Sequence, residues 1–530
     1  MNLFTIFNIK KKSKVLIFGT GAGGSRLFHS IRNNKNVIGF LDNNIQRQGT
    51  PFLGKDVFSP STISNLHFDE IIIASDYYLE IFQQLTTELS VPKEYISIFY
   101  NDKPEDKNIY LQFKEKATHY FKTLICNSPK SFVEFNFSVI SFFSPSLKGN
   151  HLFNITWLDN LVVHKIAVLR KKENGFSYPP IKNKQKANKV PIIIPEVALF
   201  QFTNAQISTV SNTVLLKDRT AIIARVPSTP VNVADYSGGS VIFHSSNTAI
   251  VRLEECDNIT KGIAIIGPSD TNYYHWLMEV LSKLQFLNEL PPSIKSYPLL
   301  LSEKAKAIPS ISEYLSYFSI KNDIVWLNST KNYSVDNLIT LSPPNYIAPN
   351  LINEQTCAAE NCYIRKESID YLRDKALTKY EPSGTLKNKR IFLARKSFIR
   401  DYNQDEVNNL LRSYGFTSVY LEDLSFKEQV GLMQEAEFII GPTGAAWTNL
   451  IFANKKIIGL TWVAEEAKHF SGYSSLAKHL DIQLDFITYK ANTKHTREIY
   501  YANYSIDCEK IQNWLTKNVP LIKIKINEEY

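Results

Sequence analysis

The chain has 530 residues, of which 44% are hydrophobic and 21% charged, and its formal net charge is +9. This length exceeds what one hydrophobic core usually serves, and the composition is that of a folded globular protein, so fibrous and disordered chains are excluded. Basic residues are mostly interspersed with acidic ones, so the charge favours weak attraction to phosphorylated ligands or anionic lipids and does not require nucleic acid as a partner.

The cysteines and the apolar segments bear on the cellular compartment. Five scattered cysteines form no Cys-x-x-Cys pair, so neither a zinc site nor a redox motif is predicted. The apolar start precedes its lysines, which reverses the order of a secretory signal, and no apolar run is long enough to span a bilayer. We therefore expect a cytoplasmic protein, with peripheral attachment to the inner face of the cytoplasmic membrane as an open alternative.

The first hundred residues carry the pattern of a small parallel βαβ array. Strands are predicted at 14–19, 36–41, 70–75 and 95–100, and a helix over 77–89. Gly19, Gly21 and Gly24 stand in the G-x-G-x-x-G register, which allows a tight turn, a close phosphate and close helix packing. Asp42 ends the second strand, where an acid can hold a ribose hydroxyl. From the residues alone, a purely structural glycine turn is an equal alternative.

This segment resembles the N-terminal Rossmann-like domains of sugar O-acyltransferases and polysaccharide biosynthesis proteins, through Gly39-Phe-Leu-Asp-Asn-Asn44. The resemblance implies a nucleotide-binding domain over 1–101, with a nucleotide or sugar nucleotide as its ligand. An NAD-dependent sugar-nucleotide oxidoreductase is the alternative enzyme that the glycine motif allows.

Residues 102–190 are predicted to be a linker and a helical and β connector. Residues 102–106 are charged and broken by proline, an amphipathic helix is expected over 111–124, and the basic stretch 182–189 is interpreted as a solvated loop. Short strands are then predicted at 197–202, 207–210, 213–216 and 221–225. They form a β-rich middle segment in which no chemistry is visible.

From residue 262 onward, strands and helices alternate. The first set has strands at 262–266, 297–301 and 323–327, a helix over 273–290 and a further segment over 311–318. The second set has strands at 390–394, 417–421 and 438–440, with helices over 404–414 and 427–436. This alternation predicts two doubly wound sheets that face each other across a cleft, with ligands at the carboxyl ends of the strands.

Four motifs occur in this region, in the order Asn272-Tyr-Tyr-His-Trp-Leu-Met-Glu279, then Arg395 with Arg400 and Asn403, then Leu424-Ser-Phe-Lys-Glu-Gln429, then Gly441-Pro-Thr-Gly-Ala-Ala-Trp-Thr-Asn449. Their order and spacing resemble those of glycosyltransferase family 61 over residues 190–490. The resemblance implies an α/β chain with a GT-B-like pair of Rossmann-like domains. In it, 191–384 would be the acceptor side and 385–530 the donor side.

The resemblance also implies a reaction. Such enzymes are inverting, metal-independent transferases that move a sugar from a nucleotide-sugar donor to a glycan or lipid-linked glycan acceptor, and bacterial ones serve capsule or lipopolysaccharide synthesis. No Asp-x-Asp triplet offers ligands for a metal on the donor diphosphate. We therefore expect no metal site and no cofactor for transfer. Whether a hexosyl, pentosyl or N-acetylhexosaminyl group is moved stays open.

The strand end and the glycine loop of the second set suggest a donor site. Backbone N–H groups near a glycine loop at a helix start can hold a diphosphate, and a guanidinium at a strand end can contact it in bidentate fashion. Arg395 is the leading contact. The further expected donor-binding residues are Lys396, Arg400, Gln429, Thr443, Gly444, Ala445, Thr448 and Asn449. Asn403 with Glu406, and Ser425 with Glu428, have the spacing of helix capping boxes and are interpreted as structural.

His275 and Glu279 are the expected catalytic residues. They lie four positions apart on one predicted helix and therefore share a face, and an inverting displacement needs a base for the acceptor proton. An ordinary exposed His–Glu pair is the structural alternative. Family members often carry histidine in the glycine loop, where this chain has Thr443. The base could therefore be His275, Glu279 or Glu465, or it could be lost, which would leave a non-catalytic sugar-nucleotide-binding scaffold.

Overall fold

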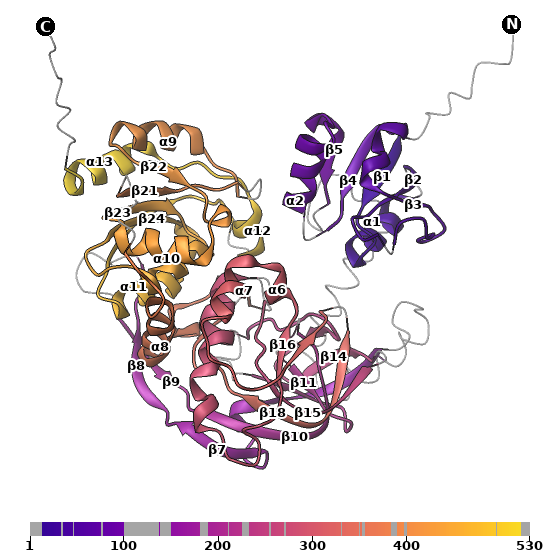
Figure 1. Ribbon diagram of the computed structural model, residues 1–530, viewed down its shortest axis with the longest axis vertical. Helices are drawn as coiled ribbons and strands as arrows, with labels where there is room; N and C mark the ends of the chain where they lie inside the picture. Colours follow the sequence, from indigo (N-terminus) through magenta and orange to yellow (C-terminus); the bar gives the residue numbers. More distant parts are fainter. Residues whose placement is uncertain are drawn as a thin grey trace, which may run out of the picture. The chain divides into compact units, whose positions relative to one another are not determined.

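The computed structural model describes residues 13–520, except 33–34, 46, 76–77, 100–136, 138–149, 181–188, 210, 212, 225–232, 254–255, 270–271, 330, 349, 352–355, 383–388, 397–399 and 494–495. The expected linker 102–106, the helix over 111–124 and residues 182–188 of the basic stretch lie outside the described residues. The chain divides into two compact units, 1–120 and 121–530 (Figure 1). This division is coarser than the predicted one, and the finer boundaries stay predictions.

Unit 1 contains a five-stranded sheet in which every neighbouring pair is parallel, in the order β3-β2-β1-β4-β5. The four strands expected from the sequence are present, together with a short additional one. In chain order the elements are β1 Lys14–Phe18, α1 Ala22–Ile31, β2 Asn36–Leu41, β3 Val57–Phe58, η1 Pro60–Asn65, β4 Glu70–Ile73, α2 Tyr78–Gln83, η2 Gln84–Glu88, η3 Lys93–Tyr95 and β5 Ile96–Ile98. The buried apolar side chains of β1, β2 and β4 fill two cores, one on each sheet face.

Unit 2 begins with a large mixed sheet, in which β15, β16, β17 and β18 pair in parallel and β10 pairs antiparallel with β18. Strands of the predicted β-rich middle segment therefore pair in one sheet with the strands predicted after residue 262. The strands are β6 Asn150–Trp157, β7 Lys165–Arg170, β8 Glu173–Ser177, β9 Val190–Ile194, β10 Val197–Ile207, β11 Thr213–Leu215, β12 Thr220–Ile223, β13 Val241–His244, β14 Thr248–Arg252, β15 Cys256–Ala264, β16 Leu299–Ser302, β17 Ile324–Leu327, β18 Asn332–Leu341, β19 Tyr346–Ile347 and β20 Cys362–Tyr363. Two short pairs, β8 with β9 and β19 with β20, stand apart from the large sheet.

One long helix was expected over 273–290, but the structure has three consecutive helical types there. They are α5 Tyr273–His275, the π-helix η6 Trp276–Val280 and the 3-10 helix η7 Leu281–Glu289. The carbonyl of Met278 accepts hydrogen bonds from the side chains of Ser282 (2.5 Å) and Asn345 (2.7 Å). Side chains that occupy a backbone acceptor disturb the regular helical pattern, which accounts for the change of type. The other helices of unit 2 before residue 390, among its described residues, are α6 Lys304–Ala307, α7 Pro309–Leu315, α8 Lys366–Leu377, η5 Leu158–Asn160 and η8 Ala359–Asn361.

The remainder of unit 2 is a second sheet, all parallel, in the order β22-β21-β23-β24-β25. Its expected strands and helices are confirmed to within a few residues. They are β21 Arg390–Leu393, α9 Gln404–Ser413, β22 Thr417–Val419, η9 Leu421–Asp423, α10 Phe426–Glu435, β23 Phe438–Pro442, η10 Ala445–Phe452, β24 Ile458–Ala464, η11 Glu465–Ala467, α11 Gly472–His479, β25 Gln483–Tyr489, α12 Thr496–Tyr501 and α13 Cys508–Asn518. Ser425 and Glu428 form the expected capping box of α10.

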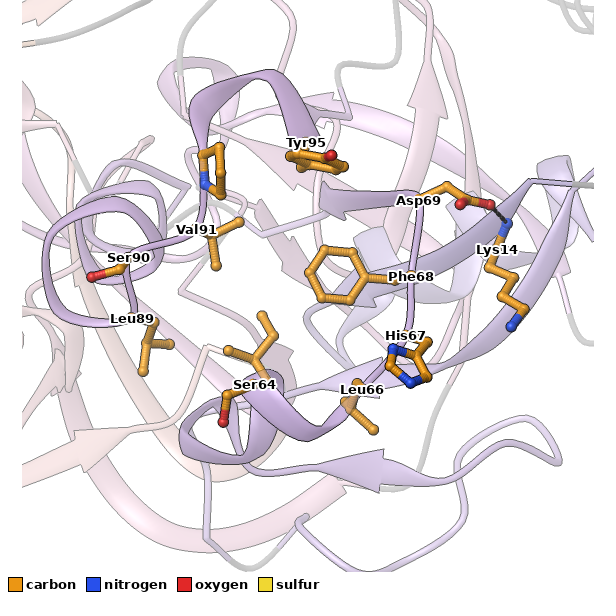
Figure 2. Close-up of a pocket in the computed structure, with 12 residues that line it drawn as sticks. Lys14, Ser64, Leu66, His67, Phe68, Asp69, Leu89, Ser90, Val91 and Tyr95 are labelled. Carbon is orange, nitrogen blue, oxygen red and sulfur yellow. Dashed lines mark hydrogen bonds between the residues drawn. The ribbon is translucent and has the colours of Figure 1, made fainter.

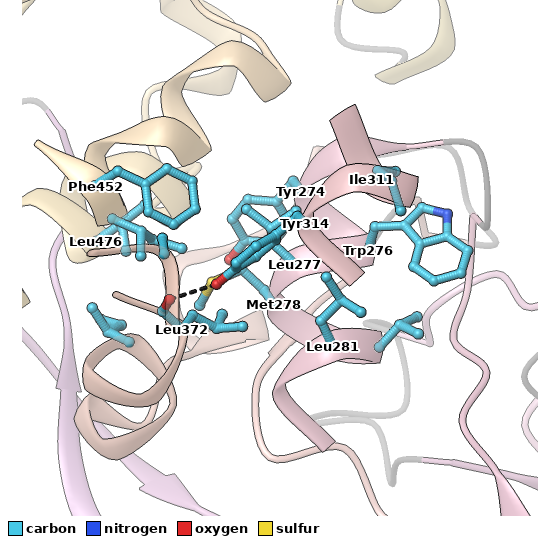
Figure 3. Close-up of a cluster of buried hydrophobic side chains, with 14 of the residues drawn as sticks. Tyr274, Trp276, Leu277, Met278, Leu281, Ile311, Tyr314, Leu372, Phe452 and Leu476 are labelled. Carbon is cyan, nitrogen blue, oxygen red and sulfur yellow. Dashed lines mark hydrogen bonds between the residues drawn. The ribbon is translucent and has the colours of Figure 1, made fainter. Parts of the chain in front are cut away.

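A single hydrophobic core joins the two halves of unit 2. Buried side chains between Val197 and Leu341 pack with others between Ile391 and Ile482. Figure 3 shows part of this core, including the hydrogen bond of 2.5 Å that the Tyr314 hydroxyl donates to the Leu372 carbonyl. The Tyr314 ring also stacks on that of Phe426, with ring centroids 4.1 Å apart. Within the described parts of the chain, no helix combines the length and apolar character needed to cross a membrane.

Candidate active site

The candidate donor site lies at the carboxyl edge of the second sheet of unit 2. Arg395 follows β21, the turn of Thr443 and Gly444 follows β23, Glu465 follows β24, and Tyr489 ends β25. These strands are parallel and hydrogen-bonded in the order given above, so their carboxyl ends meet at one edge. The structure thus brings the arginine and the glycine turn together, as the motifs suggested.

Arg395 is held at both ends. Its backbone N–H donates to Oε1 of Gln404 (2.7 Å), and Nε2 of Gln404 donates to the Arg395 carbonyl (2.9 Å). Its guanidinium donates from Nη2 to the carbonyl of Thr443 (2.5 Å). A side chain at Gly444 would place its Cβ 3.0 Å from that Nη2, so glycine lets the guanidinium lie against the turn. Gln404 was not singled out by sequence reasoning.

Arg400 lies near Arg395. Burial is the largest cause that lowers the pKa of Arg395, and the positive charge of Arg400 is the second. Arg395 still carries its proton at neutral pH, because arginine does not titrate there. Arg400 adopts a positive φ of 55°, and its buried Nε has no hydrogen-bond partner. Its closest described polar contact is 3.4 Å, from Nη2 to the hydroxyl of Tyr489. Among described residues, no carboxylate forms an ion pair with either arginine, so the pair favours an anionic ligand.

Tyrosines surround the two arginines. Tyr504 stacks between Tyr402 and Tyr489, with centroid distances of 5.4 Å and 3.9 Å, and its hydroxyl accepts from Nε1 of Trp462 (2.8 Å). Burial raises the pKa of Tyr504, and the charges of Arg395 and Arg400 act in the opposite direction. Sequence reasoning missed this cluster. The dense run Tyr500-Tyr-Ala-Asn-Tyr504 was the signal that could have indicated it.

The glycine turn starts a 3-10 helix. The N–H groups of Ala445 and Ala446 have no backbone acceptor among the described residues, and no side chain caps this end. Thr443 donates its hydroxyl to the Trp462 carbonyl, so its side chain fastens the turn to β24. Thr448 is fully buried and its hydroxyl has no hydrogen-bond partner. The backbone of the turn, rather than the Thr443 side chain, is therefore free to bind an anion.

Three of the expected donor-binding side chains have partners within the protein. Lys396 is exposed and forms an ion pair with Asp423. Gln429 donates to the carbonyls of Leu421 (3.0 Å) and Leu424 (3.2 Å), and accepts from Nδ2 of Asn449 (3.3 Å). Gln429 and Asn449 are both buried, so they support the loop from within and do not point toward open space.

The expected capping box at Asn403 is not formed. The Asn403 side chain makes no capping bond to its own helix α9. Instead, Oδ1 accepts from the N–H of Ile506 (2.9 Å), and Nδ2 donates to Glu406 (2.6 Å) and to the Ile506 carbonyl (3.0 Å). A partner a hundred residues away replaces the local cap, which sequence spacing could not reveal. Asn403 therefore ties α9 to the segment before α13.

His275 and Glu279 lie close together, but they are not the exposed pair that the structural alternative assumed. Their exposed fractions are 6% and 1%, and His275 Nδ1 lies 3.1 Å from Glu279 Oε1. That contact is at ion-pairing distance but lacks hydrogen-bond geometry. Glu279 Oε1 accepts from the Ile347 N–H (3.1 Å), and Oε2 is buried without a hydrogen-bond partner. The π-helix η6 contains Glu279, and π-turns are frequent at functional sites.

Aromatic side chains connect this pair to the arginines. The Tyr274 ring lies 5.7 Å from that of His275 and 5.8 Å from that of Tyr473. Burial raises the pKa of Tyr473, while the charges of Arg400 and Arg395 lower it, which places Tyr473 within their electrostatic reach. Tyr273 donates its hydroxyl to Asn449 (2.9 Å) on η10. The candidate base and the candidate donor site are thus linked through packed side chains.

In unit 1, the glycine turn and Asp42 meet at the carboxyl edge of the sheet. A Cβ on Gly24 would lie 1.9 Å from the Gly19 carbonyl, and Gly19 has a φ of 113°, so both positions require glycine. Gly21 faces open space. Asp42 accepts from the N–H of Thr20 (2.8 Å) and from its hydroxyl (2.5 Å), and from the Asn44 N–H (2.9 Å). Its carboxylate therefore holds the turn, whether or not it also contacts a ligand.

A pocket of about 700 Å³ lies at the other edge of this sheet (Figure 2). Its lining includes Lys14, at the start of β1, and Asp69, just before β4. The two are joined by a hydrogen bond of 2.7 Å from the Lys14 N–H to the Asp69 carboxylate. None of Gly19, Gly21, Gly24 and Asp42 lines it, so this pocket and the expected nucleotide site are separate.

Comparison with known proteins identifies the class of the chain. Residues 273–459, which include His275, Arg395 and the glycine turn, match the family described as Glycosyltransferase 61. The chain is therefore a glycosyltransferase, and this match favours transfer over the oxidoreductase alternative.

Further comparisons concern unit 1 and the search for relatives. Residues 11–97 match the family described as C2185-like, N-terminal. One similar solved structure is that of UDP-D-quinovosamine 4-dehydrogenase from Vibrio fischeri, with 21% identity over 20% of this chain and 86% of that chain, at a TM-score of 0.15. No curated protein matches the sequence.

Proposed function

We propose that this chain is an inverting, metal-independent glycosyltransferase that binds its nucleotide-sugar donor at the carboxyl edge of the second sheet. One observation carries the proposal: Arg395 and Arg400 lie near each other, and no described carboxylate pairs with either. Two such cations favour a doubly charged diphosphate. The unpaired N–H groups of Ala445 and Ala446 add donors beside them.

The transfer follows from this arrangement. An acceptor hydroxyl attacks the anomeric carbon of the donor sugar, the bond from that carbon to the diphosphate oxygen breaks, and the configuration inverts in the single displacement. The electron pair leaves on the diphosphate, whose growing charge Arg395, Arg400 and the helix start stabilise. Such preorganised charge costs little reorganisation during the reaction. Metal independence rests on the sequence alone.

We propose that His275 takes the proton of the acceptor hydroxyl and that Glu279 holds its ring. The carboxylate is the more deeply buried of the two and is fixed by the Ile347 N–H. A base oriented by a buried carboxylate is a recurrent catalytic arrangement. Glu465, which is exposed at the same sheet edge as Arg395, is the second candidate base.

The remaining parts of the proposal concern the biological setting. We propose a GT-B-like pair of Rossmann-like domains, with 191–384 as acceptor side and 385–530 as donor side, and a nucleotide or sugar nucleotide at the glycine turn of unit 1. The acceptor would be a glycan or a lipid-linked glycan in capsule or lipopolysaccharide synthesis, and the protein would act in the cytoplasm, peripherally at the membrane.

Release of nucleoside diphosphate tests the proposal. The purified chain is incubated with a panel of nucleotide sugars and glycan acceptors in excess EDTA, and the anomeric configuration of the product is read by NMR. We expect turnover with one donor and inversion of configuration. Activity that vanished in EDTA and returned with a divalent metal would contradict metal independence, and retention of configuration would contradict the single displacement.

A further inference from the structure

Unit 2 exposes an unusual concentration of large apolar side chains on one short segment. Eight such residues of unit 2 are strongly exposed among those described, and six of them lie between residues 162 and 193. They are Val162 (75%), Val163 (92%), Ile166 (42%), Val168 (48%), Phe176 (40%) and Ile193 (66%). Scattered single residues of this kind need no explanation, but a local cluster indicates an interaction surface.

Phe176 and Ile193 belong to the antiparallel ribbon formed by β8 and β9. Its register pairs Phe176 with Pro191 and Asn174 with Ile193, and all four residues are exposed. The alternate residues Ser177 and Ile194 are buried. The ribbon therefore has one face on the protein and one apolar face in solvent, as expected from the two-residue period of strands.

Contacts with the rest of unit 2 hold the ribbon in place. Ser177 donates to Ser471 (2.6 Å), and the Tyr178 N–H donates to Ser475 (3.0 Å) on α11. Arg365, which is 4% exposed, pairs with Glu173 at 2.7 Å. Figure 1 shows β8 and β9 running along the outside of unit 2, from β7 toward α11. Because the inner face is anchored, the outer face keeps its orientation without a ligand.

The charges beside this face are basic. Lys171, Lys172 and Lys189 are exposed, and among the described residues none of them forms an ion pair with a carboxylate. Lys189 lies over the Phe176 ring, with Nζ 4.4 Å from its centroid. The acid of the ribbon, Glu173, is already paired with Arg365. Apolar side chains flanked by unpaired lysines complement a membrane surface that carries anionic headgroups.

We propose that the outer face of the β8–β9 ribbon, with Phe176 and Ile193 as its apolar anchors and Lys171, Lys172 and Lys189 as its basic contacts, binds anionic phospholipid. Apolar side chains enter the boundary between headgroups and acyl chains, while the lysines pair with lipid phosphates. This attachment does not depend on the donor site, and it would bring the enzyme to acceptors that are carried on lipid.

Sedimentation with vesicles tests the proposal on the full chain. Vesicles of phosphatidylethanolamine with phosphatidylglycerol are compared with vesicles of phosphatidylcholine alone. We expect binding to the anionic vesicles that weakens with salt. Replacing Lys171, Lys172 and Lys189 by Gln, or Phe176 and Ile193 by Ser, should reduce the partition coefficient at least about tenfold, because each basic or apolar contact near the surface adds to binding.

Matched controls separate this surface from net charge and general apolarity. The exposed residues Lys217, Lys455 and Lys456, replaced by Gln, remove the same charge, and the exposed Ile242 and Leu253, replaced by Ser, remove similar apolar area. Both controls should bind as the wild type does. No binding by the wild type, equal losses in ribbon and control variants, or self-association through the ribbon in light scattering would each overturn the proposal.

Discussion

Arg395 shows how one side chain acquires a role from its position. It follows a buried strand, is fixed at its backbone by Gln404, and directs its guanidinium at the glycine turn. In the proposed reaction, it stabilises charge that develops on the diphosphate. We expect Arg395→Ala to lower kcat/KM about 10²–10³-fold, as for other lost donors to a developing anion.

The neighbouring lysine supplies the control. Lys396 is exposed and paired with Asp423, so Lys396→Ala should change kcat/KM less than about threefold, within the small contribution of surface ion pairs. Both variants are compared by steady-state kinetics and by Tm. A loss of activity in Arg395→Ala that only follows its loss of Tm would mean that the arginine supports the fold and not the reaction.

A second residue predicts how stability depends on pH. His244 is fully buried, accepts the Tyr236 N–H at Nε2 (2.9 Å), and Nδ1 lies 2.9 Å from the Ser245 carbonyl. Burial lowers the pKa of His244 below its usual 6.5, while the Ser245 carbonyl and Asp235 act in the opposite direction. The unfolded chain then binds a proton that the folded chain excludes, so stability from this group is present above about pH 6.5 and is lost as pH falls.

Urea unfolding at several pH values measures this dependence. The free energy of unfolding of unit 2 should fall below about pH 6.5 in the wild type. His244→Gln keeps a hydrogen-bond acceptor but cannot titrate, so its free energy of unfolding should fall less steeply as the pH decreases. Identical slopes for the two proteins between pH 7.5 and pH 5 would show that His244 titrates as it does in the unfolded chain.

The sequence allowed site residues at the ends of strands to be predicted, but not site residues whose contacts lie far away in the chain. Arg395 and Gly444 could be named because a buried strand precedes each of them. Gln404, Tyr489 and Tyr504 were missed, because their roles arise from contacts between segments 9 to about 100 positions apart. Gln429 was expected near the nucleotide, yet its amide serves backbone carbonyls inside the protein.

At the scale of elements, α1 depends on close contact between its first turn and the glycine loop. A Cβ on Gly24 would lie 1.9 Å from the Gly19 carbonyl, whereas one on Gly21 would meet nothing within 4 Å. We expect Gly24→Ala to destabilise unit 1 by about 1–3 kcal/mol, as overpacking usually does, and Gly21→Ala to be close to neutral. Hydrogen exchange of residues 14–98 in the full chain measures both.

The same pair of variants checks the structure of the turn. Equal protection of residues 14–98 in the two variants would mean that α1 does not need close contact with the glycine loop. A loss of protection in Gly21→Ala alone would mean that Gly21, and not Gly24, is the glycine that the turn requires.

Helices and strands could be predicted from the sequence wherever the apolar residues followed one clear period. All strands of the second sheet of unit 2 that were expected are present. Strands were expected at 197–202 and 207–210, but β10 continues through the gap between them and pairs with β18 from Leu199 to Ile207, despite a positive φ of 51° at Asn204. The helical stretch after residue 272 was expected to be regular, and buried side chains from other segments changed its type. Tertiary contacts overrode local preference in both cases.

At the scale of the whole molecule, the shared core of unit 2 predicts cooperative unfolding. Trp447 is fully buried in that core, and Phe40 is fully buried in unit 1. Trp447→Ala should destabilise both halves of unit 2 together, by about 3–5 kcal/mol, and leave unit 1 unchanged. Phe40→Ala should destabilise unit 1 and leave both halves of unit 2 unchanged. Calorimetry with hydrogen exchange distinguishes the segments.

Separate transitions for residues 191–384 and 385–530 would contradict this expectation and would indicate two independently folding halves. The sequence suggested such halves, because alternating strands and helices indicate two sheets but carry no information on whether their cores merge. The side chains that join them, among them Tyr314 and Phe426, lie more than a hundred positions apart.

If the arginines of unit 2 hold the donor, stabilisation by nucleotide sugars should depend on them. Tm is measured for the wild type, Arg395→Ala and Gly21→Asp against nucleotide sugars, free nucleotides and NAD(P), since a ligand that binds the folded state raises Tm. We expect stabilisation of unit 2 by one nucleotide-sugar series, which is lost in Arg395→Ala and kept in Gly21→Asp. Stabilisation by NAD(P) alone, lost in Gly21→Asp and kept in Arg395→Ala, would contradict it.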